Sequence, residues 1–194
     1  MVARGVQTEE AVLIERSREG DQDAFRQLVE RYQVAVHNLA YRMLGDPNDA
    51  EDAAQEIFMR IYRQLGRYDP SRKFSTWTLA IATNYCIDQL RRRRMQLVPL
   101  ENIIPWARSR EVGPEGEAIT QEARDDVQRL IMRLPEKYRA PLVLRYFEEL
   151  SCAEIAEVLG MPEGTVKTQI HRARKSLEKL LAEGEEPRNA LSRV

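Results

Sequence analysis

Hydrophobic residues recur at helical spacing through most of this chain, and no segment shows the apolar–polar alternation with period two that marks a strand. The spacing and the flanking cap residues predict an all-α fold. The expected helices cover residues 8–20, 21–45, 46–66, 75–94, 121–133, a segment restarting at 135, 151–160 and 162–181.

Several helix starts are marked by cap residues. Asp21 or Asp23 is expected to cap the second helix, and Asp46 with a following proline opens the third. Ser75 is expected to cap the fourth helix, with Phe74 before it as part of a hydrophobic staple. In the later segment that restarts at 135, Pro141 is expected either to kink the helix or to mark its first turn.

Helical periodicity is lost between Met95 and Thr120, where prolines and glycines interrupt the chain. This break predicts two small helical domains joined by a flexible linker. The expected boundaries are a first domain at 1–95, a linker at 96–120, a second domain at 121–184 and a flexible tail at 185–194.

The end of the second domain has the pattern of a helix-turn-helix. Ser151 and Glu154 have the spacing of a capping box, which satisfies two backbone N–H groups at a helix start. Gly160 stands where a helix ends in a left-handed conformation, and Pro162 suits the start of the next helix.

The second helix of this unit has an apolar face and a basic face. Five Lys or Arg and one Glu lie between Gly164 and Leu181. The outward positions are Lys167, Thr168, Gln169, His171, Arg172, Arg174 and Lys175. A short helix with such side chains outward suits insertion into the major groove of DNA.

Composition limits the other possibilities. The 194 residues are 43% hydrophobic and 31% charged, with a net charge of −1, so DNA contact has to come from local basic patches. The two cysteines, Cys86 and Cys152, are predicted to be reduced thiols in a cytosolic protein. Neither a membrane span nor a secretory signal is evident in the sequence.

No catalytic constellation is visible in the sequence. His37 and His171 fall in different domains, and neither a nucleophile triad nor a glycine-rich phosphate loop is present. The acidic residues Asp46 and Asp49 lack the further ligands and the glycine of a calcium loop. We therefore expect a protein that is not an enzyme and uses neither a metal nor another cofactor.

Four longer motifs resemble extracytoplasmic-function (ECF) sigma factors, small specificity subunits of bacterial RNA polymerase. They are GDQDAFRQLVERY, YRMLGDPNDAEDAAQEIFMRIY, FSTWTLAIATNYCIDQLRRRR and LPEKYRAPLVLRYFEELSCAEIAEVLGMPEGTVKTQIHRARKSL. The resemblance implies that the first domain binds polymerase and reads the −10 promoter element, and that the second reads the −35 element. It also implies core RNA polymerase, promoter DNA and an anti-sigma factor as partners, and a role in stress response.

The resemblance also assigns roles to individual residues. Contacts with the coiled coil of the polymerase β′ subunit fall on Asp52, Gln55, Glu56 and Phe58. Contacts with the −10 element, and its melting, fall on Phe74, Trp77, Asn84, Arg91 and Arg92. Contacts with the −35 element fall on Lys167, Thr168, His171, Arg172, Arg174 and Lys175.

The residues alone leave other interpretations open. Phe58 and Trp77 have the spacing of core residues, and the arginines at 91–94 also complement the dipole at a helix C-terminus. The helix-turn-helix is compatible with a stand-alone repressor or activator, which has no need of a polymerase-binding helix. A third possibility is an adaptor in which both helical domains bind only proteins.

Overall fold

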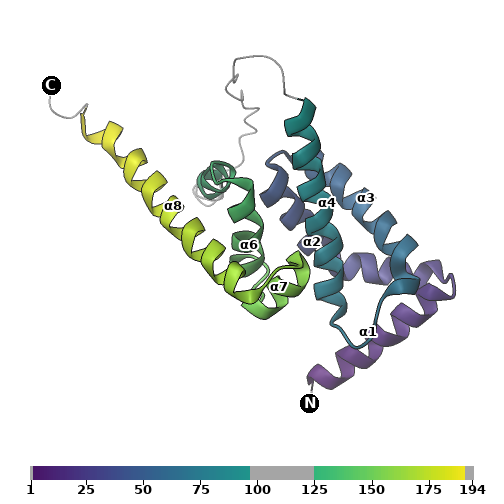
Figure 1. The fold of residues 1–194 in the computed structure, drawn as a ribbon. Helices are drawn as coiled ribbons and strands as arrows, with labels where there is room; N and C mark the ends of the chain where they lie inside the picture. Colours follow the sequence, from purple (N-terminus) through teal and green to yellow (C-terminus); the bar gives the residue numbers. More distant parts are fainter. Residues whose placement is uncertain (1, 97–124, 191–194) are drawn as a thin grey trace.

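The computed structural model describes residues 2–96 and 125–190, and no strand occurs within these ranges. The helices are α1 (Val2–Arg18), α2 (Gln22–Leu44), α3 (Pro47–Gln64), the 3₁₀ turn η1 (Leu65–Arg67), α4 (Phe74–Gln96), a helical segment at 125–132, α6 (Glu136–Tyr146), α7 (Cys152–Leu159) and α8 (Glu163–Ala190). The expected all-α fold is confirmed. We call 2–96 the N-terminal lobe and 125–190 the C-terminal lobe (Figure 1). The proposed linker at 96–120 lies almost wholly outside the described residues.

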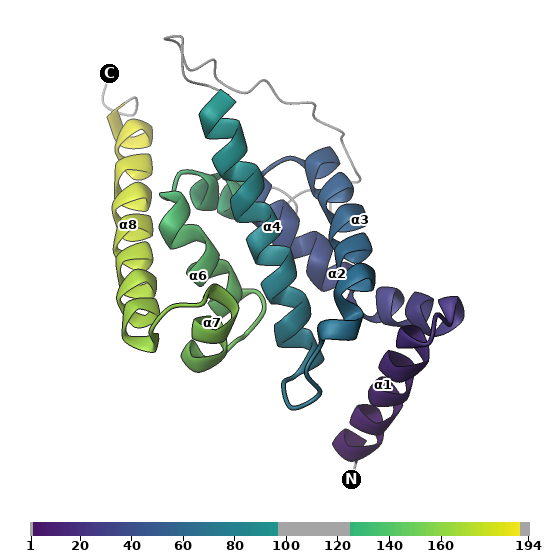
Figure 2. The ribbon, with the colours of Figure 1, turned by 45° about the vertical axis from the view of Figure 1, so that its right-hand side comes forward.

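In the N-terminal lobe, α2 packs against α3 and α4, and α1 crosses beside α2 (Figure 2). Asp21 caps α2, because its carboxylate accepts the backbone N–H groups of Asp23 and Ala24. Gly45 ends α2 in the left-handed conformation with φ of 87°. Asp46 then caps α3, with Pro47 in its first turn. These stops and starts agree with the sequence prediction and set the hairpin between α2 and α3.

Two predicted helix starts are wrong. Helix α1 begins at Val2 rather than Thr8, since the preceding residues include no proline that would stop a helix. Helix α4 begins at Phe74, and Ser75 lies inside its first turn instead of capping it. The Trp77 N–H donates to the carbonyl of Lys73 at 3.1 Å, so the first helical hydrogen bond starts before Ser75.

In the C-terminal lobe, α6, α7 and α8 pack against one another. Pro141 lies within α6, one turn past its start, rather than in the first turn. The capping box of Ser151 and Glu154 forms as predicted, and Gly160 ends α7 with φ of 61°. Helix α8 continues to Ala190, further than the sequence predicted, and residues 191–194 lie outside the described part of the chain.

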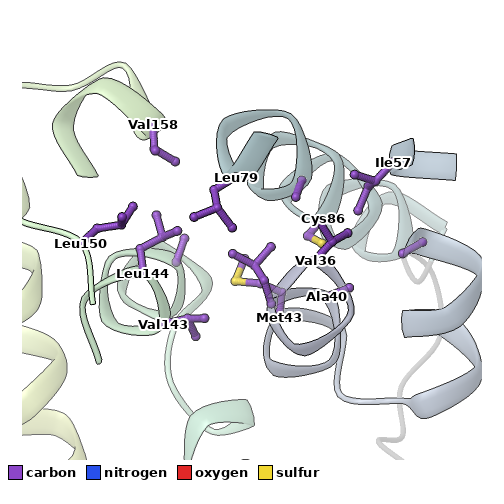
Figure 3. Close-up of a cluster of buried hydrophobic side chains, with 14 of the residues drawn as sticks. Val36, Ala40, Met43, Ile57, Leu79, Cys86, Val143, Leu144, Leu150 and Val158 are labelled. Atoms are coloured by element: carbon purple, nitrogen blue, oxygen red, sulfur yellow. The ribbon is translucent and has the colours of Figure 1, made fainter. Parts of the chain in front are cut away.

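The two lobes pack directly on one another. Helices α6 and α7 lie between α8 and α4 in both views, and α7 contacts α4 while α6 contacts α2. Figure 3 shows Leu79 of α4 pointing toward Val158 and Leu144 of the C-terminal lobe. The buried hydrophobic residues of both lobes therefore form one continuous core.

Polar contacts join the same two lobes. The buried Arg139 donates from Nη1 to the Met43 carbonyl at 2.7 Å and from Nη2 to the Met132 carbonyl at 3.0 Å. Gln128 Nε2 donates to the Tyr41 carbonyl at 2.8 Å. The residue four positions after Met43 is a proline, which has no N–H to donate. Side chains of the C-terminal lobe thus complete the last turn of α2.

Candidate nucleic-acid interface

Helix α8 presents a polar, basic face to solvent. Val166 and Ala173 are fully buried and Ile170 is 9% exposed, so one side of the helix is fixed against the rest of the lobe. The predicted −35 residues all lie on the exposed side: Lys167, Thr168, His171, Arg172, Arg174 and Lys175. The structure brings all six together within residues 167–175 of one helix.

The contacts that these side chains make are local and accessible to solvent. Lys167 Nζ lies 2.8 Å from Glu163 Oε1, and this hydrogen bond raises the pKa of Lys167. Thr168 Oγ1 donates to the Gly164 carbonyl at 2.8 Å. A hydrogen bond with Arg172 lowers the pKa of Tyr138, which places the guanidinium beside that phenol. Exposed pairs of this kind contribute little stability.

The turn before α8 holds it at a defined angle. Glu154 Oε2 accepts the Ser151 N–H at 2.9 Å, and Ser151 Oγ accepts the Glu154 N–H at 3.2 Å. Gly160 N–H closes α7 on the Ala156 carbonyl. Both ends of α7 are therefore closed by local hydrogen bonds, which fix the turn that leads into α8.

The aromatic residues at the start of α4 form a packed cluster. Phe74 is 2% exposed, and its ring lies 5.5 Å from Tyr32, 5.1 Å from Tyr68 and 5.5 Å from Trp77. Trp77 is half-buried. The Phe74 ring is therefore not accessible to a base in this conformation, whereas Trp77 keeps part of its surface exposed.

The remaining −10 candidates lie further along α4. Asn84, Arg91 and Arg92 are exposed, whereas Arg93 is bound to Asp49 at 2.7 Å. Trp77, Asn84 and Arg91 are spaced by seven residues, so they share one stripe of the helix. This stripe runs from an aromatic ring to a cluster of positive charge.

A cavity of about 410 Å³ lies between α1 and the loop before α4. Its walls include the ring of Tyr68, the acidic residues Glu10 and Glu15, and Lys73. The loop is held in place because Arg18 donates to the carbonyls of Leu65 and Tyr68. Sequence reasoning missed this cavity, and Asn84, which the resemblance places in a base pocket, does not line it.

The polymerase-binding candidates on α3 divide into two groups. Asp52 and Gln55 are exposed, whereas Glu56 is bound to Arg60 at 3.0 Å and Phe58 packs against the core. The stripe of Asp52 and Gln55 is continued by two exposed hydrophobic residues, Met59 at 48% and Tyr62 at 43% exposure. The sequence analysis did not identify these two residues. Their signal in the sequence is helical spacing from Gln55, at four and seven residues.

Family models account for both lobes. The Sigma-70 region 2 model matches residues 28–95, and the Sigma-70 region 4 model matches residues 124–177. The chain is 42% identical over 176 residues to the ECF RNA polymerase sigma factor SigW of Bacillus subtilis (strain 168), covering 87% of this chain and 94% of that protein. The chain belongs to the ECF sigma factors. Its function is therefore that of a sigma factor, which directs RNA polymerase to promoters.

Solved structures share the fold of this chain. CnrH, in a complex with the cytosolic domain of CnrY, superposes with a TM-score of 0.68 at 29% identity, covering 90% of this chain and 98% of that one. The sigma factor RpoE in complex with the anti-sigma factor NepR from Bartonella quintana shares the fold, with a TM-score of 0.64 at 21% identity over 81% of this chain and 96% of that one.

Further features of this ECF sigma factor concern its cysteines, its helices and its potential metal ligands. Cys86 is buried and Cys152 half-buried, and both are free thiols. Burial raises the pKa of Cys86 to about 12. Within residues 2–96 and 125–190, no helix is long and apolar enough to cross a membrane, and no three potential metal ligands come together.

Proposed function

We propose that this sigma factor reads the −35 element with the exposed face of α8 and the −10 element with the Trp77–Asn84–Arg91 stripe of α4. The observation that carries the proposal is the division of α8 into a buried apolar side and an exposed basic side. A helix fixed in this way presents side chains to base edges in the major groove without reorganising.

At the −35 element, Lys167, Thr168, His171 and Arg172 are assigned to base edges, and Arg174 and Lys175 to phosphates. A bidentate arginine–guanine contact discriminates by about 1–3 kcal/mol, whereas a phosphate contact adds affinity that depends on salt. Loss of Arg172 is therefore expected to change base preference, whereas loss of Arg174 is expected to change salt-dependent affinity, although both are exposed arginines on one helix.

At the −10 element, the unpaired strand is assigned to the stripe on α4. Trp77 supplies an aromatic edge, Asn84 an amide for base recognition, and Arg91 with Arg92 positive charge for phosphates. Stacking of a base on an aromatic ring contributes about 1–3 kcal/mol, which offsets the cost of unstacking it from the duplex. The buried Phe74 supports the Trp77 ring from behind.

Docking on polymerase is assigned to the exposed stripe of α3, with Asp52 and Gln55 extended by Met59 and Tyr62. Exposed aromatic and methionine side chains beside acidic and amide groups suit a basic partner helix. Glu56, held by Arg60, and Phe58, packed inward, support this surface from its edges. Because the polymerase acts on the chromosome, the proposal places the protein in the cytoplasm.

An anti-sigma factor is proposed as the regulatory partner. The similar protein RpoE was solved with the anti-sigma factor NepR, and CnrH was solved with the cytosolic domain of CnrY. A stand-alone repressor or activator is not favoured, because both region 2 and region 4 models match this chain.

The test is run-off transcription with core polymerase on a promoter library, with the wild type and matched variants of α8. Arg172→Ala is expected to lower transcription about 10- to 100-fold and to relax base preference at one position. Arg172→Lys keeps the charge but not the bidentate geometry, and is expected to lose the same preference. Lys179→Ala, further along the helix, is the control.

Failure of the wild type to confer start-site selectivity on core polymerase would contradict the proposal. Equal losses for Arg172→Lys and Lys179→Ala would contradict the assignment of base contacts to Arg172, while leaving the sigma function intact. Asn84→Ala is expected to slow promoter opening without changing binding to a duplex that carries only the −35 element.

A further inference from the structure

The basic helix α8 begins with an acidic side chain. From Glu163, its first residue, to Leu177, every other charged side chain is Lys or Arg. A carboxylate on a surface that meets DNA is repelled by the phosphates, which lowers the affinity for DNA of any sequence. Glu163 therefore opposes binding unless a hydrogen-bond donor of the DNA meets its carboxylate.

Glu163 is paired with the first of the base-contact candidates on this helix. Its Oε1 lies 2.8 Å from Lys167 Nζ, one turn further along α8. Both side chains stay accessible, with Lys167 63% exposed and Glu163 47% exposed. The ammonium has further N–H donors and the carboxylate has further lone pairs, so each group can bind DNA while the pair stays intact.

The pair lies at the end of α8 that is suited to enter the major groove. In helix-turn-helix proteins, the N-terminal residues of the second helix contact base edges. Thr168, next to Lys167, is fixed here by its hydrogen bond to the Gly164 carbonyl at 2.8 Å. Since phosphate oxygens only accept hydrogen bonds, the donors that a carboxylate meets in this groove are N4 of cytosine and N6 of adenine.

A donor beside an acceptor on the protein matches the edge of a single base pair. In a G·C pair, O6 of guanine accepts and N4 of cytosine donates, and the two atoms lie about 2.9 Å apart because they are hydrogen-bonded to each other. The 2.8 Å between Lys167 Nζ and Glu163 Oε1 is nearly the same spacing. The ammonium can therefore donate to O6 while the carboxylate accepts from N4, which closes a ring of hydrogen bonds.

We propose that Glu163 determines specificity at the −35 element, where Glu163 and Lys167 together read both bases of one base pair. The inference rests on the proposed function of α8. With the base that Lys167 contacts written first, the pair fits G·C and T·A, because guanine O6 and thymine O4 accept while their partners donate. It rejects C·G and A·T, where the ammonium meets an amino group and the carboxylate meets an oxygen. Guanine is favoured over thymine, because its N7 gives Lys167 a second acceptor.

An exposed Glu–Lys pair at this spacing also stabilises a helix slightly. A role in helix stability alone predicts no dependence on the DNA sequence. Substitution of Glu163 would then change transcription from all promoters by the same factor. The two roles are therefore distinguished by base preference and not by the amount of transcription.

The test is run-off transcription by core polymerase with the sigma factor, on a promoter library randomised across the −35 element. At one position of one strand, the wild type is expected to favour the keto bases G and T over the amino bases A and C by about tenfold. Glu163→Gln is expected to reduce this ratio to about twofold, because a glutamine amide donates as well as accepts. Most of the change is expected as a gain on the disfavoured promoters, which a destabilised helix would not produce.

Two further variants serve as control and as converse. Glu178→Gln makes the same change in net charge at an exposed position of α8 and is expected to keep the wild-type ratio. Glu163→Lys combined with Lys167→Glu exchanges donor and acceptor, so it is expected to reverse the preference at that position from keto to amino bases. The inference is overturned when Glu163→Gln keeps the wild-type ratio, or when Glu178→Gln loses it equally.

Arg172→Ala, measured on the same library, separates this inference from the proposed function. A wild type that selects promoters and responds to Arg172→Ala, while Glu163→Gln leaves every base preference unchanged, overturns the role of Glu163 alone. A wild type without any preference across the −35 element overturns the reading of that element by α8, and the role of Glu163 with it.

Discussion

The two lobes prepare their candidate DNA-binding residues in opposite ways. In the C-terminal lobe, six side chains stand exposed on α8 above a buried apolar face. In the N-terminal lobe, Phe74 is buried, Trp77 is half-buried and the nearby Lys73 is bound to Glu154 of α7. A surface that reads intact duplex has to be preformed, whereas one that captures an unpaired strand can stay covered until the strand exists.

The largest expected effect comes from breaking the joint between the lobes at Arg139. Its guanidinium binds the carbonyls of Met43, Met132 and Leu134, so Arg139→Ala leaves several buried acceptors without a donor. We expect a loss of about 3 kcal/mol in the free energy of unfolding. Thermal unfolding is expected to change from one transition to two, because the lobes lose their coupling.

Arg145→Ala is the matched control for this change. Arg145 donates to the Leu150 carbonyl at 2.8 Å, within the C-terminal lobe. It is expected to lower the stability of that lobe and to leave the unfolding of the whole chain in one transition. Two transitions in the control as well would contradict the assignment of the coupling between the lobes to Arg139.

The next effect tests the close approach at the end of α2. Gly45 has φ of 87°, and a Cβ there would collide with the Met132 side chain of the other lobe. Gly45→Ala is expected to cost about 2 kcal/mol of unfolding free energy, measured by denaturant titration. Adding Met132→Ala is expected to recover the part due to the collision, but not the part due to backbone strain.

A smaller expected effect is a dependence of the stability on pH that arises in the C-terminal lobe. Burial raises the pKa of Glu148, in the turn between α6 and α7, to about 7. Its native state binds the proton more tightly than the unfolded state does, so stability is highest below about pH 4.5 and falls as pH rises through 7. Allowing for partial solvent access, the loss by pH 8 is about 1 kcal/mol.

Glu148→Gln is expected to remove this pH dependence and to be the more stable protein at pH 8, measured by denaturant titration at pH 5 and pH 8. If the free energy of unfolding changed equally with pH in the wild type and the variant, Glu148 would be excluded as the source of the pH dependence. Glu154 is not a competing source in this range, because its pKa is lowered to about 2 and its contribution is lost only in acid.

The smallest effect concerns backbone strain in the same turn. Glu149 has φ of 54°, a left-handed conformation that costs a non-glycine residue about 1 kcal/mol. Glu149→Gly is expected to raise the stability of the C-terminal lobe by a few tenths of a kcal/mol, because relief of strain exceeds the added entropy of the unfolded chain. Differential scanning calorimetry would detect the change as a slightly higher Tm.

Local features were predictable from the sequence because they depend on residues three or four apart. The capping box of Ser151 and Glu154, the left-handed Gly45 and Gly160, and the exposed side of α8 all follow from such spacing. The start of α4 was predicted wrongly, because Ser75 is a good cap in isolation but the helix begins at the buried Phe74.

The contacts between lobes were beyond such reasoning. Arg139 and Met43 are 96 positions apart, and nothing in the local pattern indicates that a guanidinium will meet that carbonyl. The same holds for Lys73 and Glu154, each of which has the appearance of an ordinary surface charge in the sequence. The cavity beside Tyr68 also depends on how α1 crosses the loop, which no single segment specifies.

The dependence of α2 on side chains made much later has a consequence for synthesis. While the ribosome is still translating the second half of the protein, the Met43 carbonyl at the end of α2 lacks its side-chain partner, since Arg139 does not yet exist. The nascent first half is therefore expected to emerge with a frayed corner, which becomes ordered only after the remainder of the polypeptide has been released.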